Sequence, residues 1–192
     1  MAASLVLASQ SPRRRALLRR YGFKFEVVPA RVEELESAHL SLSELTIANA
    51  TRKGRVVQRQ RNAAIVLAAD TLVSLNGEII GKPRDMDEAR LALRRLSGRA
   101  HQVCTGVFVA GPGQTVASFS EISWVRFRKL SESAIADYLA KINPLDKAGA
   151  YAAQGAGREI IASVEGSFTN VVGLPMERTI QVLASFGIYP AR

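Results

Sequence analysis

A short apolar strand runs almost directly into a helix near the beginning of the chain. Leu5 to Ser9 has a strand pattern, and Ser11 followed by Pro12 marks a helix start, since serine is a good N-cap and proline fits the first helical position. Three arginines, Arg13 to Arg15, occupy the first turn, where the partial positive charge of the helix favours acidic residues. A bound anion, such as a phosphate, would compensate the positive charge of these arginines and of the helix N-terminus. The alternative is a solvated basic helix start.

The rest of the chain alternates between strand and helix patterns, which is typical of an α/β fold. The run Ala64 to Ala69 is continuously apolar and stops at Asp70. This pattern predicts a buried strand whose last residue emerges into a cleft. Further strands are expected at residues 23–28, 102–109, 115–128 and near 160–164, and helices at residues 12–21, 43–58, 85–98, 131–143 and 175–187.

Asn76-Gly77 between two apolar runs predicts a β-hairpin with a type I′ turn. Leu75 then pairs with Glu78, and the same register sets Thr71 opposite Lys82. We therefore expect Asp70, Thr71 and Lys82 at one end of the hairpin. In the helix that follows, the spacing predicts a buried stripe of four residues, Met86, Ala89, Leu93 and Leu96.

Length and composition narrow the class of protein. A chain of 192 residues is expected to form one domain, residues 1–192. No apolar run is long enough to span a membrane, and no export signal is visible, so we expect a cytoplasmic protein. A single cysteine excludes an internal disulfide and agrees with a reducing compartment. The net charge of +9 favours polyanionic partners, although nucleic acid is not expected because aromatic residues do not interleave with the basic runs.

Three familiar catalytic arrangements are excluded. The segment from Gly77 to Lys82 has three residues between its glycines and continues with Pro83, so it is not a Walker A motif. A Ser–His–Asp triad would need His39 or His101, and neither is near a nucleophile-elbow sequence. A Cys–His dyad is also excluded, because Cys104 lies three residues from His101 in an expected strand. The two side chains therefore face opposite sides of the sheet. We expect Cys104 to be a small core residue.

Acidic and basic residues at the ends of elements remain as candidates for chemistry. They are Arg13, Arg14, Glu33, Lys53, Asp70, Lys82, Asp146 and Lys147. Carboxylate oxygens such as those of Glu33 and Asp70 suit Mg²⁺ or Mn²⁺. Several cations together suit a polyphosphate, whose negative charge must be held during attack. This set indicates phosphoryl or nucleotidyl hydrolysis.

Five motifs, in order, resemble those of the Maf family of nucleoside triphosphate pyrophosphatases. They are Leu7 to Arg14 (LASQSPRR), Ala69 to Thr71 (ADT), Gly81 to Pro83 (GKP), Asp146 to Tyr151 (DKAGAY), and Gly166 to Pro175 (GSFTNVVGLP). The resemblance covers nearly the whole chain. It implies an α/β domain with a mixed sheet in two lobes around a central cleft, as in inosine triphosphatase-like proteins, and a homodimer.

The resemblance also implies an activity and a set of site residues. The reaction is hydrolysis between the α- and β-phosphates of a nucleoside triphosphate, which gives a nucleoside monophosphate and pyrophosphate. Asp70 matches the proton acceptor, and Glu33 with Asp70 matches the positions associated with a divalent metal, Mg²⁺ or Mn²⁺. The positions that match triphosphate-binding residues are Ser9, Arg13, Arg14, Lys53 and Lys82.

Arg13, Thr71 and Gln154 resemble the combination of the branch that hydrolyses dTTP and UTP. Two positions depart from the family pattern. Asn143 stands where the family often has Glu, so a metal or substrate role is not carried over to it. Phe168 replaces a frequent Tyr. The alternative function is a basic nucleic-acid-binding or cell-division (septum) regulatory protein with a vestigial nucleotide pocket, which would bind polyanions in a salt-sensitive way without catalysis.

Overall fold

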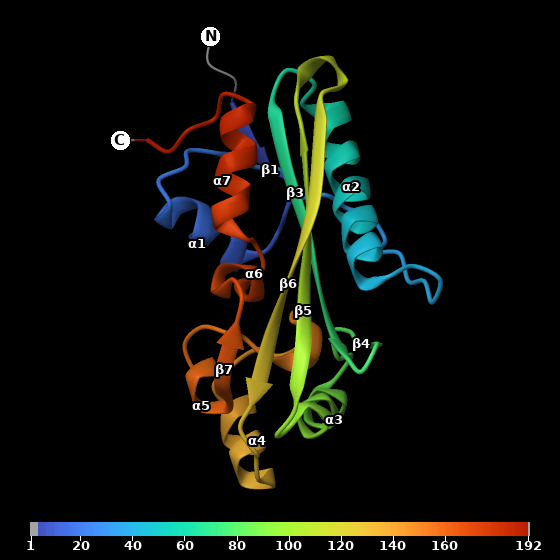
Figure 1. The fold of residues 1–192 in the computed structure, drawn as a ribbon, viewed down its shortest axis with the longest axis vertical. Coiled ribbons are helices and arrows are strands. Elements are labelled where there is room, and N and C mark those ends of the chain that lie inside the picture. Colours follow the sequence, from blue (N-terminus) through green and yellow to red (C-terminus); the bar gives the residue numbers. More distant parts are fainter. Residues whose placement is uncertain (1–3, 192) are drawn as a thin grey trace. The chain divides into compact units, whose positions relative to one another are not determined.

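A mixed seven-stranded sheet organises the chain, which we describe over residues 4–191 in a computed structural model (Figure 1). The strand order is β2-β1-β3-β5-β6-β7, and β4 pairs with β3. β1 runs parallel to β2 and β3, whereas the β3–β4 and β6–β7 pairs are antiparallel. The strands are β1 (Leu5–Leu7), β2 (Glu26–Val27), β3 (Ile65–Leu75), β4 (Glu78–Ile80), β5 (Ala100–Ala110), β6 (Val116–Phe127) and β7 (Ile161–Glu165). The expected mixed α/β fold is confirmed.

Seven α-helices are assigned among the described residues, with short 3-10 turns at Pro112–Gln114 and Ala148–Ala150. They are α1 (Pro12–Arg20), α2 (Leu42–Gln60), α3 (Met86–Leu96), α4 (Glu132–Leu139), α5 (Gly157–Ile160), α6 (Phe168–Val172) and α7 (Met176–Ser185). None of the helices within residues 4–191 is both long and apolar enough to cross a membrane.

The chain divides into two compact units, as the expected two lobes require. Unit 1 contains the described residues up to Asp70, Thr105–Glu121 and the described residues from Gly173 onward. Unit 2 contains Thr71–Cys104 and Ile122–Val172. The boundary therefore falls within strands β3, β5 and β6.

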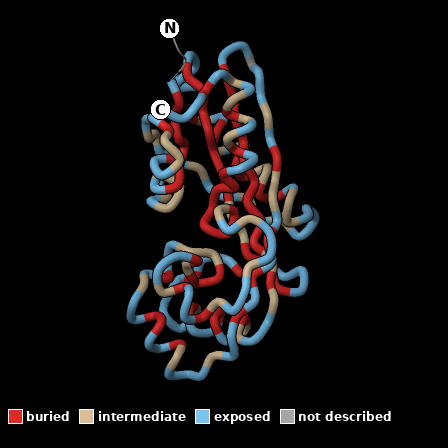
Figure 2. The backbone as a smooth tube through the Cα atoms, turned by 60° about the vertical axis from the view of Figure 1, so that its left-hand side comes forward, coloured by how far each residue is buried: buried red, intermediate tan, exposed pale blue. Residues whose placement is uncertain are grey.

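In unit 1, α2 packs closely on β5. A Cβ added to Gly54 would lie 2.2 Å from the ring of Phe108, and one added to Gly106 would lie 2.3 Å from the carbonyl carbon of Thr46. Only glycine leaves room for this approach. α2 lies to one side of the unit 1 strands, and α1 and α7 lie to the other (Figure 1). The buried residues follow the strands between them (Figure 2).

The predicted hairpin turn is confirmed. Asn76 and Gly77 have φ values of +53° and +86°, as a type I′ turn requires. The pairs Leu75–Glu78, Ser74–Ile79 and Val73–Ile80 follow the expected register. β4 ends at Ile80, so the strand pairs do not reach the level of Thr71 and Lys82, and their opposition stays a prediction.

The expected strand end at Asp70 is wrong. β3 continues through Asp70 to Leu75 as one strand of 11 residues. The apolar run stops at Asp70 because this carboxylate has an ionic partner in the core, which allows a charge inside a buried strand. Beyond it Thr71 and Leu72 are half-buried, and the strand is buried again from Val73 to Leu75, where β4 pairs.

Other differences concern the ends and faces of elements. β2 is only two residues long, and α5 and α6 lie where no helix was expected. Met86 is 39% exposed, so its expected place in the buried stripe of α3 is wrong; the stripe is Ala89, Ala92, Leu93 and Leu96. Met86 is the first helical residue, one turn before the packed part of α3. Cys104 is fully buried, as predicted.

Candidate active site

The predicted helix start at Ser11 forms the first part of the site. Ser11 is the N-cap of α1 and accepts a hydrogen bond from the backbone N–H of Arg14 (3.5 Å), and Pro12 is the first helical residue. No acidic residue lies in the first turn. The positive end of the helix, with its Arg13 and Arg14 side chains, is therefore suited to a negatively charged ligand.

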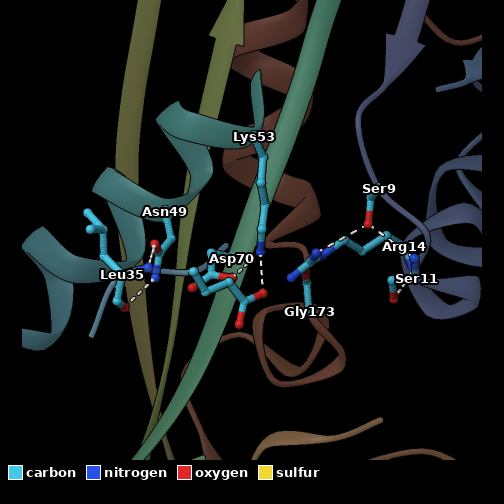
Figure 3. Close-up of polar contacts among 9 residues, drawn as sticks. Ser9, Ser11, Arg14, Leu35, Asn49, Lys53, Asp70 and Gly173 are labelled. Carbon is cyan, nitrogen blue, oxygen red and sulfur yellow. Dashed lines mark hydrogen bonds and ion pairs between the residues drawn. The ribbon is translucent and has the colours of Figure 1, made fainter. Parts of the chain in front are cut away.

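The Arg14 side chain is held by two groups from distant parts of unit 1. Its Nε donates to the carbonyl oxygen of Gly173 at 2.7 Å, and its Nη1 donates to Ser9 Oγ at 3.3 Å. Ser9 Oγ also accepts the Ser11 N–H at 3.1 Å, at the junction of β1 and α1. Figure 3 shows Arg14 reaching between Ser9 and Gly173. The guanidinium thus has a fixed direction.

The Lys53 ammonium, on α2, forms ion pairs with two carboxylates. Its Nζ lies 2.6 Å from Asp70 Oδ1 and 2.6 Å from Glu34 Oε1 (Figure 3). The Asp70 side chain is 5% exposed, that of Lys53 13% and that of Glu34 36%. The ammonium therefore serves as the counter-ion of a buried carboxylate from β3 and of a more exposed one from the loop before α2.

Asn49 fixes the loop that carries Glu34. Its Oδ1 accepts the Leu35 N–H at 2.7 Å, and its Nδ2 donates to the Leu35 carbonyl at 3.2 Å (Figure 3). Asn49 is buried and lies one helical turn before Lys53. A capping box formed by Ser41 and Glu44 fixes the start of α2 itself. The loop and the helix are thus held together next to the ion pair.

One of the two carboxylate oxygens of Asp70 has no hydrogen-bond partner among the described residues. Its Oδ1 binds Lys53, whereas its Oδ2 is buried and has no hydrogen-bond partner among residues 4–191. A buried carboxylate oxygen without a partner is costly, so such an atom calls for a water, an ion or a substrate group. This is the strongest indication of chemistry in unit 1.

The charges of the site influence one another. Burial lowers the pKa of Arg14; the negative charge of Asp70 opposes this shift, the nearby positive charge of Arg13 adds to it, and Glu34 also opposes it. Desolvation disfavours a charged group unless opposite charge compensates. Burial is thus the largest influence on the guanidinium, and an anion at the N-terminus of α1 would stabilise its charged form.

The donor atoms fit a hard divalent cation. Asp70 and Glu34 supply carboxylate oxygens on either side of the Lys53 ammonium. No group of three or more His, Cys, Asp or Glu side chains that could hold a metal is found within the described part of the chain. Mg²⁺ needs no such cage, since it is commonly held by one or two carboxylates, substrate phosphates and water.

The structure brings four of the predicted site residues together in unit 1. These are Ser9, Arg14, Lys53 and Asp70. Arg13 lies close enough to act on the pKa of Arg14. Glu33 is exposed, and it is the neighbouring Glu34 that contacts Lys53.

The other predicted residues lie in unit 2. Thr71 is half-buried in β3, Lys82 is exposed just after β4, and Gln154 is exposed in the loop before α5. Asn143 has a local role, because its Oδ1 accepts the Leu145 N–H at 3.2 Å and so forms a turn before the DKAGAY motif. Short Asn and Asp side chains are the ones that form such turns.

Sequence reasoning missed Glu34, Asn49 and the Gly173 carbonyl. Glu34 lies beside Glu33 in a loop, where no periodicity tells which of two adjacent carboxylates faces the helix. The helical spacing of Asn49 and Lys53 was available as a signal, because residues four apart share a face of the helix. The Gly173 carbonyl carries no side-chain signal.

Comparison with known proteins shows which family the chain belongs to. The profile of the family described as Maf-like protein matches residues 4–186. The chain belongs to the Maf-like protein family. It is 49% identical to the dTTP/UTP pyrophosphatase of Symbiobacterium thermophilum, over 97% of this chain and 95% of that protein. It is 42% identical to the dTTP/UTP pyrophosphatase of Akkermansia muciniphila, over 97% of this chain and 98% of that protein.

Among solved structures, this Maf-like chain is similar to the Ham1 protein of Staphylococcus aureus. The TM-score is 0.47 at 19% sequence identity, over 65% of this chain and 71% of that one.

Proposed function

We propose that the protein is a nucleoside triphosphate pyrophosphatase that hydrolyses dTTP and UTP to the nucleoside monophosphate and pyrophosphate. Its membership of the Maf-like family and the names of relatives with 40% to 49% identity support this activity. The observation that carries the mechanism is Asp70, whose Oδ1 is held by Lys53 while its buried Oδ2 has no partner among residues 4–191.

Asp70 is the proposed proton acceptor. A water molecule attacks the α-phosphorus, and the new P–O bond forms as the bond to the bridging oxygen breaks and pyrophosphate leaves. Asp70 Oδ2 takes the proton of the attacking water, because it is the carboxylate oxygen that Lys53 leaves open. The ion pair with Lys53 holds the carboxylate in one orientation.

The cations of unit 1 are proposed to bind the triphosphate. Arg14 is held with its fork in a fixed direction by Ser9 and Gly173, which suits bidentate contact with phosphate oxygens. Arg13 and Lys53 add positive charge that balances the charge of the leaving pyrophosphate. Thr71, Lys82 and Gln154 of unit 2 are proposed as further substrate-binding residues, on the family resemblance alone.

A divalent cation, Mg²⁺ or Mn²⁺, is proposed as the cofactor, held by Asp70 together with a glutamate from the loop before α2. Glu33 was the expected partner, but the contact of Glu34 with Lys53 favours Glu34 for this role. When bound, the metal polarises phosphoryl oxygens and offsets their charge. A homodimer and a cytoplasmic location are further proposals, taken from the resemblance and the composition.

A pyrophosphate-release assay over a panel of nucleoside triphosphates, with and without EDTA, tests the proposal. The wild type should favour dTTP and UTP and lose activity in EDTA. Asp70→Asn should still bind nucleotide yet release almost no pyrophosphate, whereas the matched control Asp137→Asn, an exposed carboxylate of α4, should keep full activity. Salt-sensitive binding of polyanions without any hydrolysis would instead support the nucleic-acid-binding alternative.

A further inference from the structure

A buried aromatic cluster in unit 2 is not used by the proposed chemistry. It consists of His101 at the start of β5, Phe127 at the end of β6, and Tyr151 in the DKAGAY motif. The rings pack edge to face, with centroids 4.9 Å apart for His101 and Phe127, 5.4 Å for His101 and Tyr151, and 4.8 Å for Phe127 and Tyr151. His101 is fully buried and Tyr151 is 6% exposed.

One hydrogen bond connects the polar atoms of this cluster. The Tyr151 hydroxyl lies 2.8 Å from His101 Nε2. Burial lowers the pKa of His101 to about 4 and raises that of Tyr151, so both are neutral near pH 7. His101 Nδ1 is buried and has no hydrogen-bond partner among the described residues. A buried nitrogen without a partner costs free energy, and other interactions of the fold must offset this cost.

That hydrogen bond holds a strained turn. Gly149 and Ala150, directly before Tyr151, have φ values of +69° and +61°. The left-handed conformation is uncommon for alanine and costs about 1 kcal/mol. A Cβ on Gly149 would lie 3.2 Å from both the Tyr151 ring and Val73, so the turn closely approaches the tyrosine. Fixing the Tyr151 ring therefore fixes the turn.

This turn is hydrogen-bonded to the segment that carries Lys82. The Gly149 N–H donates to the Gly81 carbonyl at 3.0 Å, and this carbonyl belongs to the peptide that joins Gly81 to Lys82. On the other side of Lys82, Pro83 is buried and restricts the residue before it to extended conformations. The exposed Lys82 thus projects from a backbone that is fixed at both neighbours.

We infer that His101 and Tyr151 are positioning residues for Lys82, acting through the Gly149–Ala150 turn and the Gly81 carbonyl. The inference rests on the proposed function, in which Lys82 binds a phosphate of the substrate. A cluster that only stabilised the fold would affect unfolding alone. A positioning cluster also affects how well the substrate binds, because its effect is exerted through Lys82.

A double-mutant cycle on steady-state kinetics tests the inference. Tyr151→Phe keeps the ring and removes the hydroxyl, and should raise KM for dTTP about fivefold, the effect of one hydrogen bond, with kcat changed less than twofold. His101→Phe removes the hydrogen-bonding ring nitrogen while keeping a ring and should give the same result. Lys82→Ala should raise KM further, and adding Tyr151→Phe to it should have no additional effect. Additive effects, or an unchanged KM in Lys82→Ala, overturn the inference.

A second measurement does not depend on catalysis. In the ligand-free protein, Tyr151→Phe should speed hydrogen exchange of the Gly149 amide at least tenfold, while Ser97→Ala should not. Ser97 is the matched control, since its hydroxyl accepts the Leu130 N–H at 2.8 Å elsewhere in unit 2. Unchanged exchange in Tyr151→Phe overturns the inference. Absence of hydrolysis in the wild type would overturn the proposed function, while the exchange result still decides whether the cluster holds the turn.

Discussion

Asp70 is a charged residue within a strand whose preceding residues are all buried and apolar. A buried charge is tolerated only when it is paired, and Lys53 supplies the pair at 2.6 Å. The same residue therefore links the stability of unit 1 with its proposed chemistry. The lysine balances the charge of the carboxylate inside the protein, and the carboxylate oxygen that it does not contact is the proposed proton acceptor.

Replacing Lys53 alone should lower the free energy of unfolding more than replacing Lys53 and Asp70 together. Lys53→Met leaves Asp70 buried without its ammonium, and should lower the free energy of unfolding by about 3 kcal/mol. The double variant Lys53→Met, Asp70→Asn should recover at least half of that loss, since no buried charge remains. Urea denaturation at pH 7 measures both values. A double variant less stable than Lys53→Met would contradict the assignment of the loss to an unpaired carboxylate.

His101 should make the stability depend on pH in a defined window. Burial lowers its pKa from 6.5 to about 4, so between these values the unfolded chain binds a proton that the folded protein does not. Stability is therefore full above pH 6.5 and decreases as the pH falls toward 4, by about 3 kcal/mol at most. Urea denaturation from pH 7 to 4.5 should show this decrease in the wild type.

The variant His101→Phe isolates this effect, because the other titrating groups are the same in both proteins. The difference in the free energy of unfolding between variant and wild type should shift in favour of the variant as the pH falls below 6.5. A difference that stays constant over the whole range would show that His101 takes up its proton equally well in the folded and unfolded states.

The candidate site was predictable from sequence where its residues belong to a motif or to a patterned helix, and not where they lie in an unpatterned loop. Ser9, Arg14, Lys53 and Asp70 belong to patterned elements, and the structure brings them together. Glu33 and Glu34 are adjacent in a loop, and which of them faces Lys53 depends on the hydrogen bonds of Asn49 to Leu35. Such contacts between residues 14 apart leave no periodic trace in the sequence.

At the scale of elements, α2 packs very closely on β5. In Gly106→Ala the new Cβ would meet the backbone of Thr46 at 2.3 Å, and backbone on both sides cannot move without displacing the helix. Overpacking of this kind costs about 2 kcal/mol or more. Gly81→Ala is the control, since no atom lies within 4 Å of its added Cβ and its φ is ordinary. A Gly106→Ala variant as thermally stable as Gly81→Ala would show that α2 can shift at no cost.

Elements were predicted well where local chemistry specifies them. The N-cap Ser11 and the turn at Asn76-Gly77 lie where the sequence indicated. The continuation of β3 beyond Asp70 was missed because it depends on pairing with other strands. α5 and α6 are four and five residues long, too short for a helical period to be visible, and tertiary packing determines them.

At the scale of the whole molecule, the two units share three strands. β3, β5 and β6 each pass the boundary, at 70/71, 104/105 and 121/122. Loosening one part of such a strand weakens the backbone hydrogen bonds of the rest. The two units should therefore unfold in a single cooperative transition.

The single tryptophan allows the cooperativity of unfolding between the two units to be measured. Trp124 lies in unit 2, so its fluorescence reports the unfolding of that unit, whereas Gly106→Ala disturbs unit 1. The substitution should lower the Tm seen by Trp124 fluorescence by the same amount as the Tm seen by far-ultraviolet circular dichroism, with one transition in each. A Trp124 transition that stays at the wild-type temperature would mean that the units unfold independently.

The division of the chain also bears on how such a protein can evolve. Neither unit is one continuous stretch, because the chain passes from one to the other four times. A gene segment that encodes either unit therefore cannot be exchanged between relatives by one recombination event without breaking β3, β5 or β6. A sequence change in either unit must therefore be compatible with the strands that both units share.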